Sequence, residues 1–222
     1  MNEKLYISPS LFYLKNKLHF ESNDKSIKIN SSNWHKYLEE YGWEKLPHGW
    51  KIRLKENASN FKYGILDCGA EGDCLFHCIG EALFDESNVD SHKYEVEELR
   101  KFTASKITSD NFDIILENYK CEEESYVFNG DWKPSEIKNI EELRNEVCKC
   151  GDSFWGDHLL LQLLQDYLKF NVIILNSGDS YDGSKKTYNI HPLASDIDKY
   201  NKTIILYYED GLHFKLVGYF MK

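Results

Sequence analysis

The chain has 222 residues, 41% of them hydrophobic, and a formal net charge of −10. Its 15 Tyr, 12 Phe and 5 Trp exclude an intrinsically disordered chain, which lacks the apolar mass needed to offset the entropy of ordering. The acidic balance argues against nucleic acid as a partner, because nucleic-acid binding depends on clustered Lys and Arg that displace counterions.

The six Cys are too few and too irregularly spaced to form a disulfide scaffold in a chain of this length, and they favour a reducing compartment. Residues 1–15 lack the apolar stretch of a signal peptide, and no apolar run approaches the ~20 residues that span a bilayer. We therefore expect a soluble, cytoplasmic protein without a membrane partner. If the chain is a viral or bacterial effector, the host cytoplasm is the expected location.

Residues 1–60 are expected to form an N-terminal extension. Short extended runs occupy residues 5–19, and Ser31, Ser32 and Asn33 are candidate N-caps for a helix over residues 34–41. Residues 51–54 favour a strand, and the polar residues that follow suit a connector.

The pattern changes at Phe61, and residues 61–222 are predicted to form the main folded domain. Apolar periodicity predicts helices that are separated by short loops and followed by strands. The predicted helices cover residues 74–84, 91–108, 112–119, 136–147 and 155–170, and the predicted strands cover residues 63–66, 172–175, 187–191, 204–208 and 212–219. This order predicts an α+β fold in which helices pack on a mixed β-sheet.

Cys74 has the sequence context of a thiol nucleophile. It stands at a predicted helix start, where the helix dipole favours a thiolate. Gly72 lacks a Cβ, so the loop can turn tightly and direct the backbone N–H groups near Asp73 and Cys74 towards an oxyanion. A Cys in such a loop is more often a buried packing residue, and the residues alone leave this alternative open.

His213 is the candidate base, because it follows a predicted hairpin turn on a terminal strand that could hold an imidazole rigidly. The other seven His lie in helical, polar or peripheral contexts. Cys148 and Cys150, which precede His158, form a single CxC pair, which is a weak zinc signal, so no metal is expected.

Three sequence blocks, in order, resemble the ovarian tumour (OTU) family of deubiquitinases. The first is Glu71-Gly72-Asp73-Cys74-Leu75-Phe76, which is similar to the family's Asp-Gly-Asn-Cys-Leu-Phe signature. The second is Trp155-Gly156-Asp157-His158 with the strand that follows it, and the third is Gly211-Leu212-His213-Phe214. The resemblance covers about residues 61–222.

The resemblance implies a papain-like OTU fold, with a mixed sheet packed between helical layers. It also implies hydrolysis of the isopeptide bond at the C-terminal glycine of ubiquitin, polyubiquitin or a ubiquitin-like modifier. Cys74 would attack the carbonyl carbon, His213 would move the proton, and no cofactor would be needed. Trp155 is expected to support the site by packing beside it.

One position departs from the family pattern. The family commonly has Asp or Asn two residues after the His, whereas this chain has Lys215, which offers no acceptor. Another group must therefore orient the imidazole, and Glu71 is the first candidate, followed by Asp73 and Asp210. Two alternative functions stay open: a catalytically weak or inactive ubiquitin-binding module, and a thiol protease that cleaves other peptides.

Overall fold

The structure is a computed structural model that describes residues 4–6, 9–15, 17–22, 25–30, 32–55, 62–84, 91–179, 186–193, 198 and 201–220. The chain forms two compact units, one of Met1–Leu66 with Val217–Lys222 and the other of Asp67–Leu216. The first unit thus includes residues 61–66 and 217–222, all of which the sequence analysis places in the domain of residues 61–222. Within the described ranges, no helix has the length and apolar character needed to cross a membrane.

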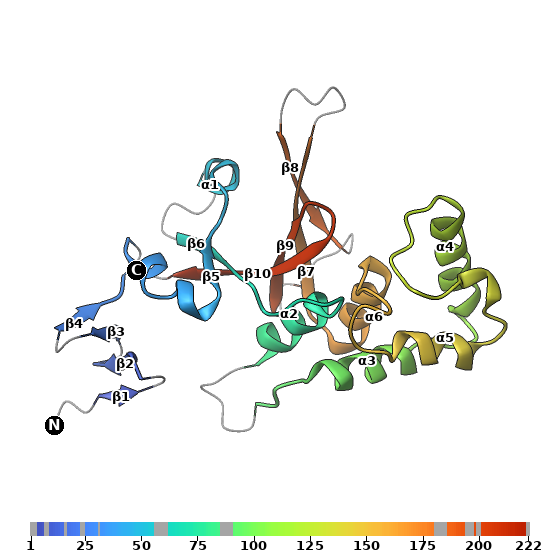
Figure 1. Cartoon of the computed structure of the whole chain (residues 1–222), viewed down its shortest axis with the longest axis horizontal. Coiled ribbons are helices and arrows are strands. Elements are labelled where there is room, and N and C mark those ends of the chain that lie inside the picture. Colours follow the sequence, from blue (N-terminus) through green and yellow to red (C-terminus); the bar gives the residue numbers. More distant parts are fainter. Residues whose placement is uncertain are drawn as a thin grey trace. The chain divides into compact units, whose positions relative to one another are not determined.

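The first unit begins with a small antiparallel sheet of four strands in chain order (Figure 1, dark blue). The strands are β1 (Leu5–Tyr6), β2 (Leu11–Leu14), β3 (Lys17–Ser22) and β4 (Lys25–Lys28). Leu11, Ile29 and Trp34 form its buried core. The ring of Trp34 meets that of Trp43 edge-on, with 6.3 Å between centroids, so aromatic packing closes this small sheet.

The prediction of a single helix over residues 34–41 is wrong. Two short 3₁₀ turns occupy this stretch, η1 (Trp34–Lys36) and η2 (Glu39–Tyr41). The side chain of Asn33 does not cap the first turn. The carbonyl of Leu38 accepts hydrogen bonds from the N–H groups of Tyr41 and Trp43, so the chain reverses here instead of continuing as a helix.

The strand expected over residues 51–54 is also wrong, because these residues lie in helix α1 (His48–Lys55). The indole of Trp50 is fully buried, and its backbone N–H donates to the carbonyl of Pro47. Ile52, which contributed to the strand-like alternation, is 61% exposed. Burial of one Trp in the first turn of the helix therefore outweighs the local pattern.

Three strands complete the first unit, in the order β5-β6-β10. Strand β5 (Trp43–Lys45) pairs antiparallel with β6 (Lys62–Leu66), which confirms the strand predicted at residues 63–66. The last residues of β10 (His213–Phe220), from Val217 onward, belong to this unit.

The second unit is built on a mixed sheet in the order β10-β9-β7-β8 (Figure 1). Strand β9 (Thr203–Glu209) lies antiparallel to β10 and parallel to β7 (Asn171–Asp179), and β8 (Lys186–Pro192) closes the sheet antiparallel to β7. All four strands confirm predicted ones. The paired segments Val172–Leu175 of β7 and Ile204–Leu206 of β9 are apolar, as expected of strands inside a layered core.

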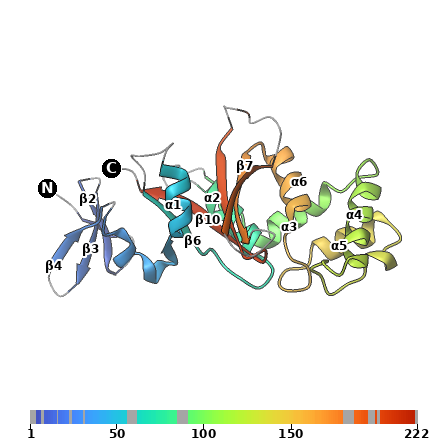
Figure 2. The ribbon, with the colours of Figure 1, turned by 90° about the horizontal axis from the view of Figure 1, so that it is seen from above.

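In the described part of the second unit, five helices pack around the core: α2 (Cys74–Leu83), α3 (Val96–Ser105), α4 (Phe112–Glu124), α5 (Ile140–Val147) and α6 (His158–Leu168). A short 3₁₀ turn, η3 (Pro134–Glu136), precedes α5. Buried residues of all five helices share one cluster with the sheet. Helices α2 and α6 lie beside the strands, and α4 and α5 lie at the far end of the unit (Figures 1 and 2). The predicted α+β fold is confirmed, although α3 begins after Glu95 and not at Ser91.

Asp157 fixes the start of α6. Its Oδ1 accepts a hydrogen bond of 2.8 Å from the N–H of Leu160, which is the geometry of an N-cap. Loss of hydration raises the pKa of this carboxyl from 3.8 to about 6, although the Leu160 N–H opposes the shift. The helix therefore begins at a carboxylate whose charged form is costly near neutral pH.

Replacing Asp157 with Asn keeps an oxygen that can cap α6 but removes the charge. A raised pKa means that the folded state holds the proton more tightly, so stability falls as the pH rises from 3.8 through about 6. The full shift in the pKa of Asp157 corresponds to about 3 kcal/mol of stability lost at high pH, and the partial exposure of the carboxyl to solvent reduces this amount. We expect Asp157→Asn to raise the free energy of unfolding by about 1–2 kcal/mol at pH 8, and by less than about 0.5 kcal/mol at pH 4, in urea denaturation.

Asp152→Asn is the matched control, because Asp152 is exposed and lies in the same segment. It should leave the free energy of unfolding unchanged at both pH values. Equal stability of wild type and Asp157→Asn at pH 8 would contradict the assignment of a destabilising charge to Asp157.

Candidate active site

The loop that leads to Cys74 makes a sharp turn at two consecutive left-handed residues. Glu71 has φ 61° and Gly72 has φ 79°, and α2 begins at Cys74. A Cβ at Gly72 would lie 2.3 Å from the carbonyl oxygen of Gly151, so both the backbone angle and the available space require glycine. The predicted tight turn before the nucleophile is therefore present.

Cys74 is buried at the start of α2, with 5% exposure. Its Sγ accepts a hydrogen bond of 3.4 Å from the backbone N–H of Phe214. Burial raises the pKa of the Cys74 thiol, and the N–H groups of Phe214 and Leu75 oppose this shift only in part. The helix start alone thus does not keep the thiol ionised, and a neighbouring base is needed to remove its proton.

A second sulfur atom helps to seat β10 against α2. The Sγ of Cys78, one helical turn after Cys74, donates to the carbonyl of Phe214 at 3.5 Å. Interaction with Cys68, together with burial, raises the pKa of Cys78 well above its ordinary value, so this thiol keeps the proton that it donates. The backbone N–H and the carbonyl of Phe214 therefore both bind side chains of α2. These contacts place the preceding residue, His213, next to the start of α2.

The ring of His213 contacts a carboxylate that the sequence analysis did not nominate. Its Nε2 lies 3.2 Å from Oδ1 of Asp67, with side-chain exposures of 25% and 41%. Asp67 directly follows β6, where the chain leaves the strand towards the nucleophile loop. The available signal was an acidic residue at a strand end, seven positions before the candidate nucleophile.

The structure does not bring Glu71 to His213. Glu71 is exposed, and the described residues provide no hydrogen bond or ion pair to its carboxylate. Asp210 lies in the exposed hairpin turn with φ 51°. Lys215 is buried at 6% exposure, and its Nζ lies 3.0 Å from Oε2 of Glu209, so its charge is paired on the neighbouring strand.

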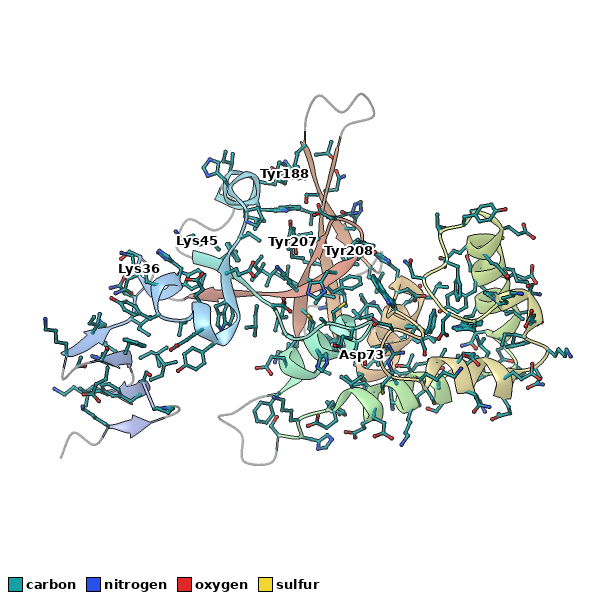
Figure 3. All side chains as sticks on the ribbon, in the orientation of Figure 1. Lys36, Lys45, Asp73, Tyr188, Tyr207 and Tyr208 are labelled. Atoms are coloured by element: carbon teal, nitrogen blue, oxygen red, sulfur yellow. The ribbon has the colours of Figure 1, made fainter. Side chains whose placement is uncertain are left out.

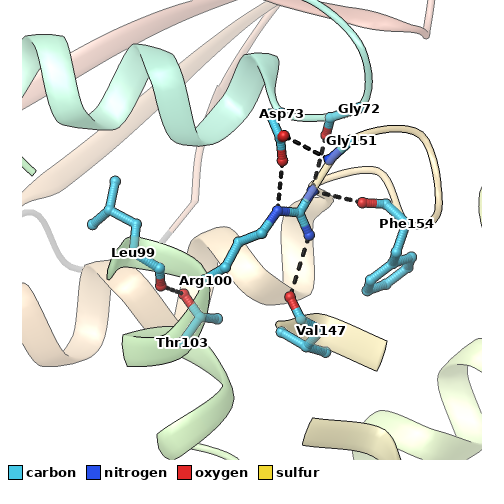
Figure 4. A network of polar contacts seen from close by, with 8 residues as sticks. All are labelled: Gly72, Asp73, Leu99, Arg100, Thr103, Val147, Gly151 and Phe154. Atoms are coloured by element: carbon cyan, nitrogen blue, oxygen red, sulfur yellow. Dashed lines mark hydrogen bonds and ion pairs between the residues drawn. The ribbon is translucent and has the colours of Figure 1, made fainter. Parts of the chain in front are cut away.

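The carboxylate of Asp73 binds groups other than the imidazole. Its Oδ1 accepts from Nε of Arg100 at 2.5 Å, and its Oδ2 accepts from the N–H of Gly151 at 2.7 Å (Figure 4). Its place at the start of α2 is shown in Figure 3. The carboxylate is fully engaged in the loop structure, which leaves its backbone N–H as its available contribution to an oxyanion site.

A pocket of about 130 Å³ lies beside this arrangement. Its lining residues come from the segment before α6, from the end of α4 and the loop after it, and from the β9–β10 hairpin: Glu122, Val127, Asn129, Phe154, Trp155, Gly156, Asp157, His158, Tyr208 and Leu212. Trp155 lies next to the loop, because its Cδ1 lies 3.0 Å from the position of a Cβ on Gly72. Its role as a support residue stays a prediction. The lining contains two carboxyl groups and no Lys or Arg, so the pocket is acidic. Burial raises the pKa of both Glu122 and Asp157, so a positive group that enters the pocket would stabilise their charged forms.

The other His and Cys of this region were also candidates for a metal site. The ring of His158 packs against Tyr208 and Phe214, and loss of hydration lowers its pKa. Among the described residues, no group of three His, Cys, Asp or Glu side chains is placed to hold a metal ion. The CxC pair at Cys148 and Cys150 therefore gains no third ligand from the part of the chain that is described.

Gly72→Ala and Gly211→Ala form a matched pair of tests, because φ is 79° at Gly72 and 76° at Gly211. Both variants place an Ala in the left-handed region of the backbone, which is strained. Only the Cβ at position 72 would also clash with a neighbour, because nothing lies within 4 Å of a Cβ on Gly211. In urea denaturation, we expect Gly211→Ala to lose about 1 kcal/mol and Gly72→Ala about 3 kcal/mol. Equal losses would contradict the described packing of the loop against Gly151.

One protein family and several solved structures match the chain. The family model of OTU-like cysteine proteases matches residues 69–214. The OTU domain of OTUD1 is 17% identical, with a TM-score of 0.48, and the match covers 76% of this chain and 91% of that one. An OTU deubiquitinase from Wolbachia pipientis, solved bound to ubiquitin, is 13% identical, with a TM-score of 0.45 and coverages of 72% and 96%. The ubiquitin-bound OTU of Hazara virus is 16% identical, with a TM-score of 0.44 and coverages of 74% and 86%.

No curated protein matches the chain. The family match spans the nucleophile loop, the block at Trp155 and the strand of His213, and so includes every element of the candidate site except Asp67. The chain belongs to the family of OTU-like cysteine proteases.

Proposed function

We propose that this protein is a deubiquitinating cysteine protease, which hydrolyses the isopeptide bond at the C-terminal glycine of ubiquitin or of a ubiquitin-like modifier. The observation that carries the proposal is the contact between Sγ of Cys74 and the N–H of Phe214, the residue that follows His213. This contact joins the helix start to the strand of the base. The contact of His213 with Asp67 adds an acceptor for the imidazole.

The roles of the two ring nitrogens follow from the Asp67 contact. Because Nε2 faces Asp67, Nδ1 is the nitrogen left to take the proton of the Cys74 thiol. The thiolate attacks the carbonyl carbon, and the imidazolium then protonates the leaving lysine amine. Water, activated by the same imidazole, hydrolyses the acyl-enzyme and releases the free C-terminus.

The acidic pocket supports a basic peptide as substrate. Glu122 and Asp157 lie in it beside Trp155 and Leu212, within the segments that flank the proposed catalytic pair. The C-terminal tail of ubiquitin is basic, so its charge complements this lining. Ubiquitin or polyubiquitin is therefore the proposed partner.

An inactive ubiquitin-binding module was the alternative suggested by Lys215. The pairing of Lys215 with Glu209, and of His213 with Asp67, favours turnover, because the base has an acceptor from another part of the chain. Hydrolysis of peptides unrelated to ubiquitin is the remaining alternative, and a substrate panel separates it from the proposal.

Ubiquitin with a C-terminal alkylating group should add once to the protein, at Cys74. Cys78 should stay unmodified, because its thiol is buried and engaged with Phe214. Cys74→Ala should bind ubiquitin without cleaving it, and His213→Ala should lose roughly 10²–10⁴ in kcat with little change in KM. Intact mass, peptide mapping and steady-state hydrolysis of a fluorogenic ubiquitin substrate provide the measurements.

Labelling at another Cys, or cleavage by Cys74→Ala, would contradict the assignment of Cys74 as the nucleophile. Cleavage of unrelated peptides as fast as ubiquitin would replace the proposed substrate class.

The orienting carboxylate can be identified by comparing Asp67 with Glu71. If Asp67 orients His213, Asp67→Ala should lose roughly 10²-fold or more in kcat, and Asp67→Asn should lose less, because the amide oxygen still accepts from Nε2. Glu71→Ala should stay within about threefold of wild type, because Glu71 is exposed and no contact joins it to His213. The measurement is hydrolysis of the same fluorogenic substrate across pH.

The opposite ranking, with Glu71→Ala impaired and Asp67→Ala near wild type, would restore the prediction made from sequence. Equal effects of Asp67→Ala and Asp67→Asn would show that the charge of Asp67 matters more than its acceptor oxygen.

A further inference from the structure

Arg100 is the most fully enclosed charged side chain among the described residues, with 0% exposure. We propose that it is a positioning residue that directs the backbone N–H of Asp73 towards the oxyanion formed during acyl transfer. The inference rests on the proposed role of Cys74 as nucleophile. It assigns to α3 a part in the reaction that does not depend on contact with substrate.

The guanidinium joins four segments of the second unit (Figure 4). Its Nε donates to Oδ1 of Asp73, and its Nη1 donates to the carbonyl of Val147 at 3.3 Å. Its Nη2 donates to the carbonyls of Gly72 at 3.3 Å and Phe154 at 2.7 Å. Buried polar groups without partners are costly, so these contacts hold all four segments in register.

The contact between Arg100 and Gly72 sets the direction of the peptide group that joins Gly72 to Asp73. The carbonyl of Gly72 accepts from Arg100 and also from the N–H of Gly156 at 3.2 Å. A trans peptide is planar, so the N–H of Asp73 must point in the opposite direction to this carbonyl. Two donors on one carbonyl therefore fix the direction of the N–H that precedes Cys74.

The N–H of Asp73 is only weakly used within the protein. Its hydrogen bond to the carbonyl of Ala70 is 3.4 Å long, beyond the usual range for such bonds. A developing oxyanion next to Cys74 is a stronger acceptor than this distant carbonyl. The loop thus keeps a donor already oriented, which is the condition for lowering the barrier of acyl transfer.

A lysine cannot reproduce these contacts. The planar guanidinium reaches Asp73, Gly72, Val147 and Phe154 together, and it also stacks over the ring of Phe76 at 4.4 Å. An ammonium keeps the positive charge but has three donors in a different geometry. Arg100→Lys therefore tests the direction of the peptide group while retaining the charge beside Asp73.

Two reactions of Cys74 separate a positioning role from a general loss of structure. With p-nitrophenyl acetate, the sulfur forms a bond to the carbonyl carbon, the oxygen takes the electron pair, and p-nitrophenolate leaves. With iodoacetamide, the sulfur forms a bond to a saturated carbon and iodide leaves, so no oxyanion forms. Both reactions require the thiolate, so a changed thiol pKa affects them equally and cancels in the ratio of their rates.

We expect Arg100→Lys to lower the rate of Cys74 acylation by about 10- to 100-fold, near the scale for loss of an oxyanion-hole donor, and to change the alkylation rate by less than about threefold. Mass spectrometry after trypsin digestion assigns each adduct to Cys74. Arg144→Lys is the matched control, because Arg144 also binds a carbonyl, that of Ile107, and a carboxylate, that of Glu141, but does not contact the nucleophile loop. It should leave the ratio of the two rates unchanged.

An unchanged ratio in Arg100→Lys, or an equal fall in both rates, would overturn the proposal and leave Arg100 a structural residue. A wild-type protein that is not acylated at Cys74 would overturn the proposed nucleophile instead. If Arg100→Lys does not fold, Asp73→Ala replaces it, because it removes both acceptor oxygens that bind Arg100 and the N–H of Gly151 but keeps the backbone N–H of residue 73. Asp73→Ala should lower the ratio at least about threefold, and an unchanged ratio in this variant would also overturn the proposal.

Discussion

A charged side chain inside a protein is tolerated only when its hydrogen-bonding groups are matched, and Arg100 imposes this condition on the second unit. The backbones at Gly72, Val147 and Phe154 each supply a carbonyl, and Asp73 supplies the counter-charge. These segments are far apart in the sequence, so their meeting fixes the nucleophile loop against α3, α5 and the start of the Trp155 block. The use of Asp73 in this network also removes it as a partner for His213.

The strand that carries the proposed base, His213, contacts the helix of the proposed nucleophile, Cys74. The contacts are made by the backbone of the next residue, Phe214. Phe214 gives its N–H to Cys74 and receives a bond from Cys78, so both sulfur atoms hold β10 at the start of α2. Its ring stacks on Tyr208, with centroids 4.4 Å apart, which joins the contact to the pocket. The position of His213 therefore depends on how β10 packs on α2, and its ring contacts Asp67.

The sequence predicted the second unit better than the first. Helices such as α2 and strands such as β9 bury regular apolar faces, and their periodicity survives folding because the same faces meet the core. In the first unit, single aromatic residues decide the structure. Trp50 places residues 51–54 in a helix, and the turn at Leu38 breaks the expected helix before Trp43. Local patterns do not contain this information, because it arises from contacts made after the chain has folded.

The sequence by itself determined the local chemistry: a Gly-dependent turn before Cys74, a helix that starts at this residue, and a hairpin that leads to His213. Three ordered blocks also pointed to the family. The tertiary structure alone decided which side chains meet across the fold, and it placed Asp67 instead of Glu71 beside the imidazole. Glu71 is closer to Cys74 in sequence, but its left-handed backbone leaves its side chain exposed, whereas Asp67 lies at the end of a strand facing β10. The direction of a side chain relative to a distant strand is set by packing, and spacing along the chain does not encode it.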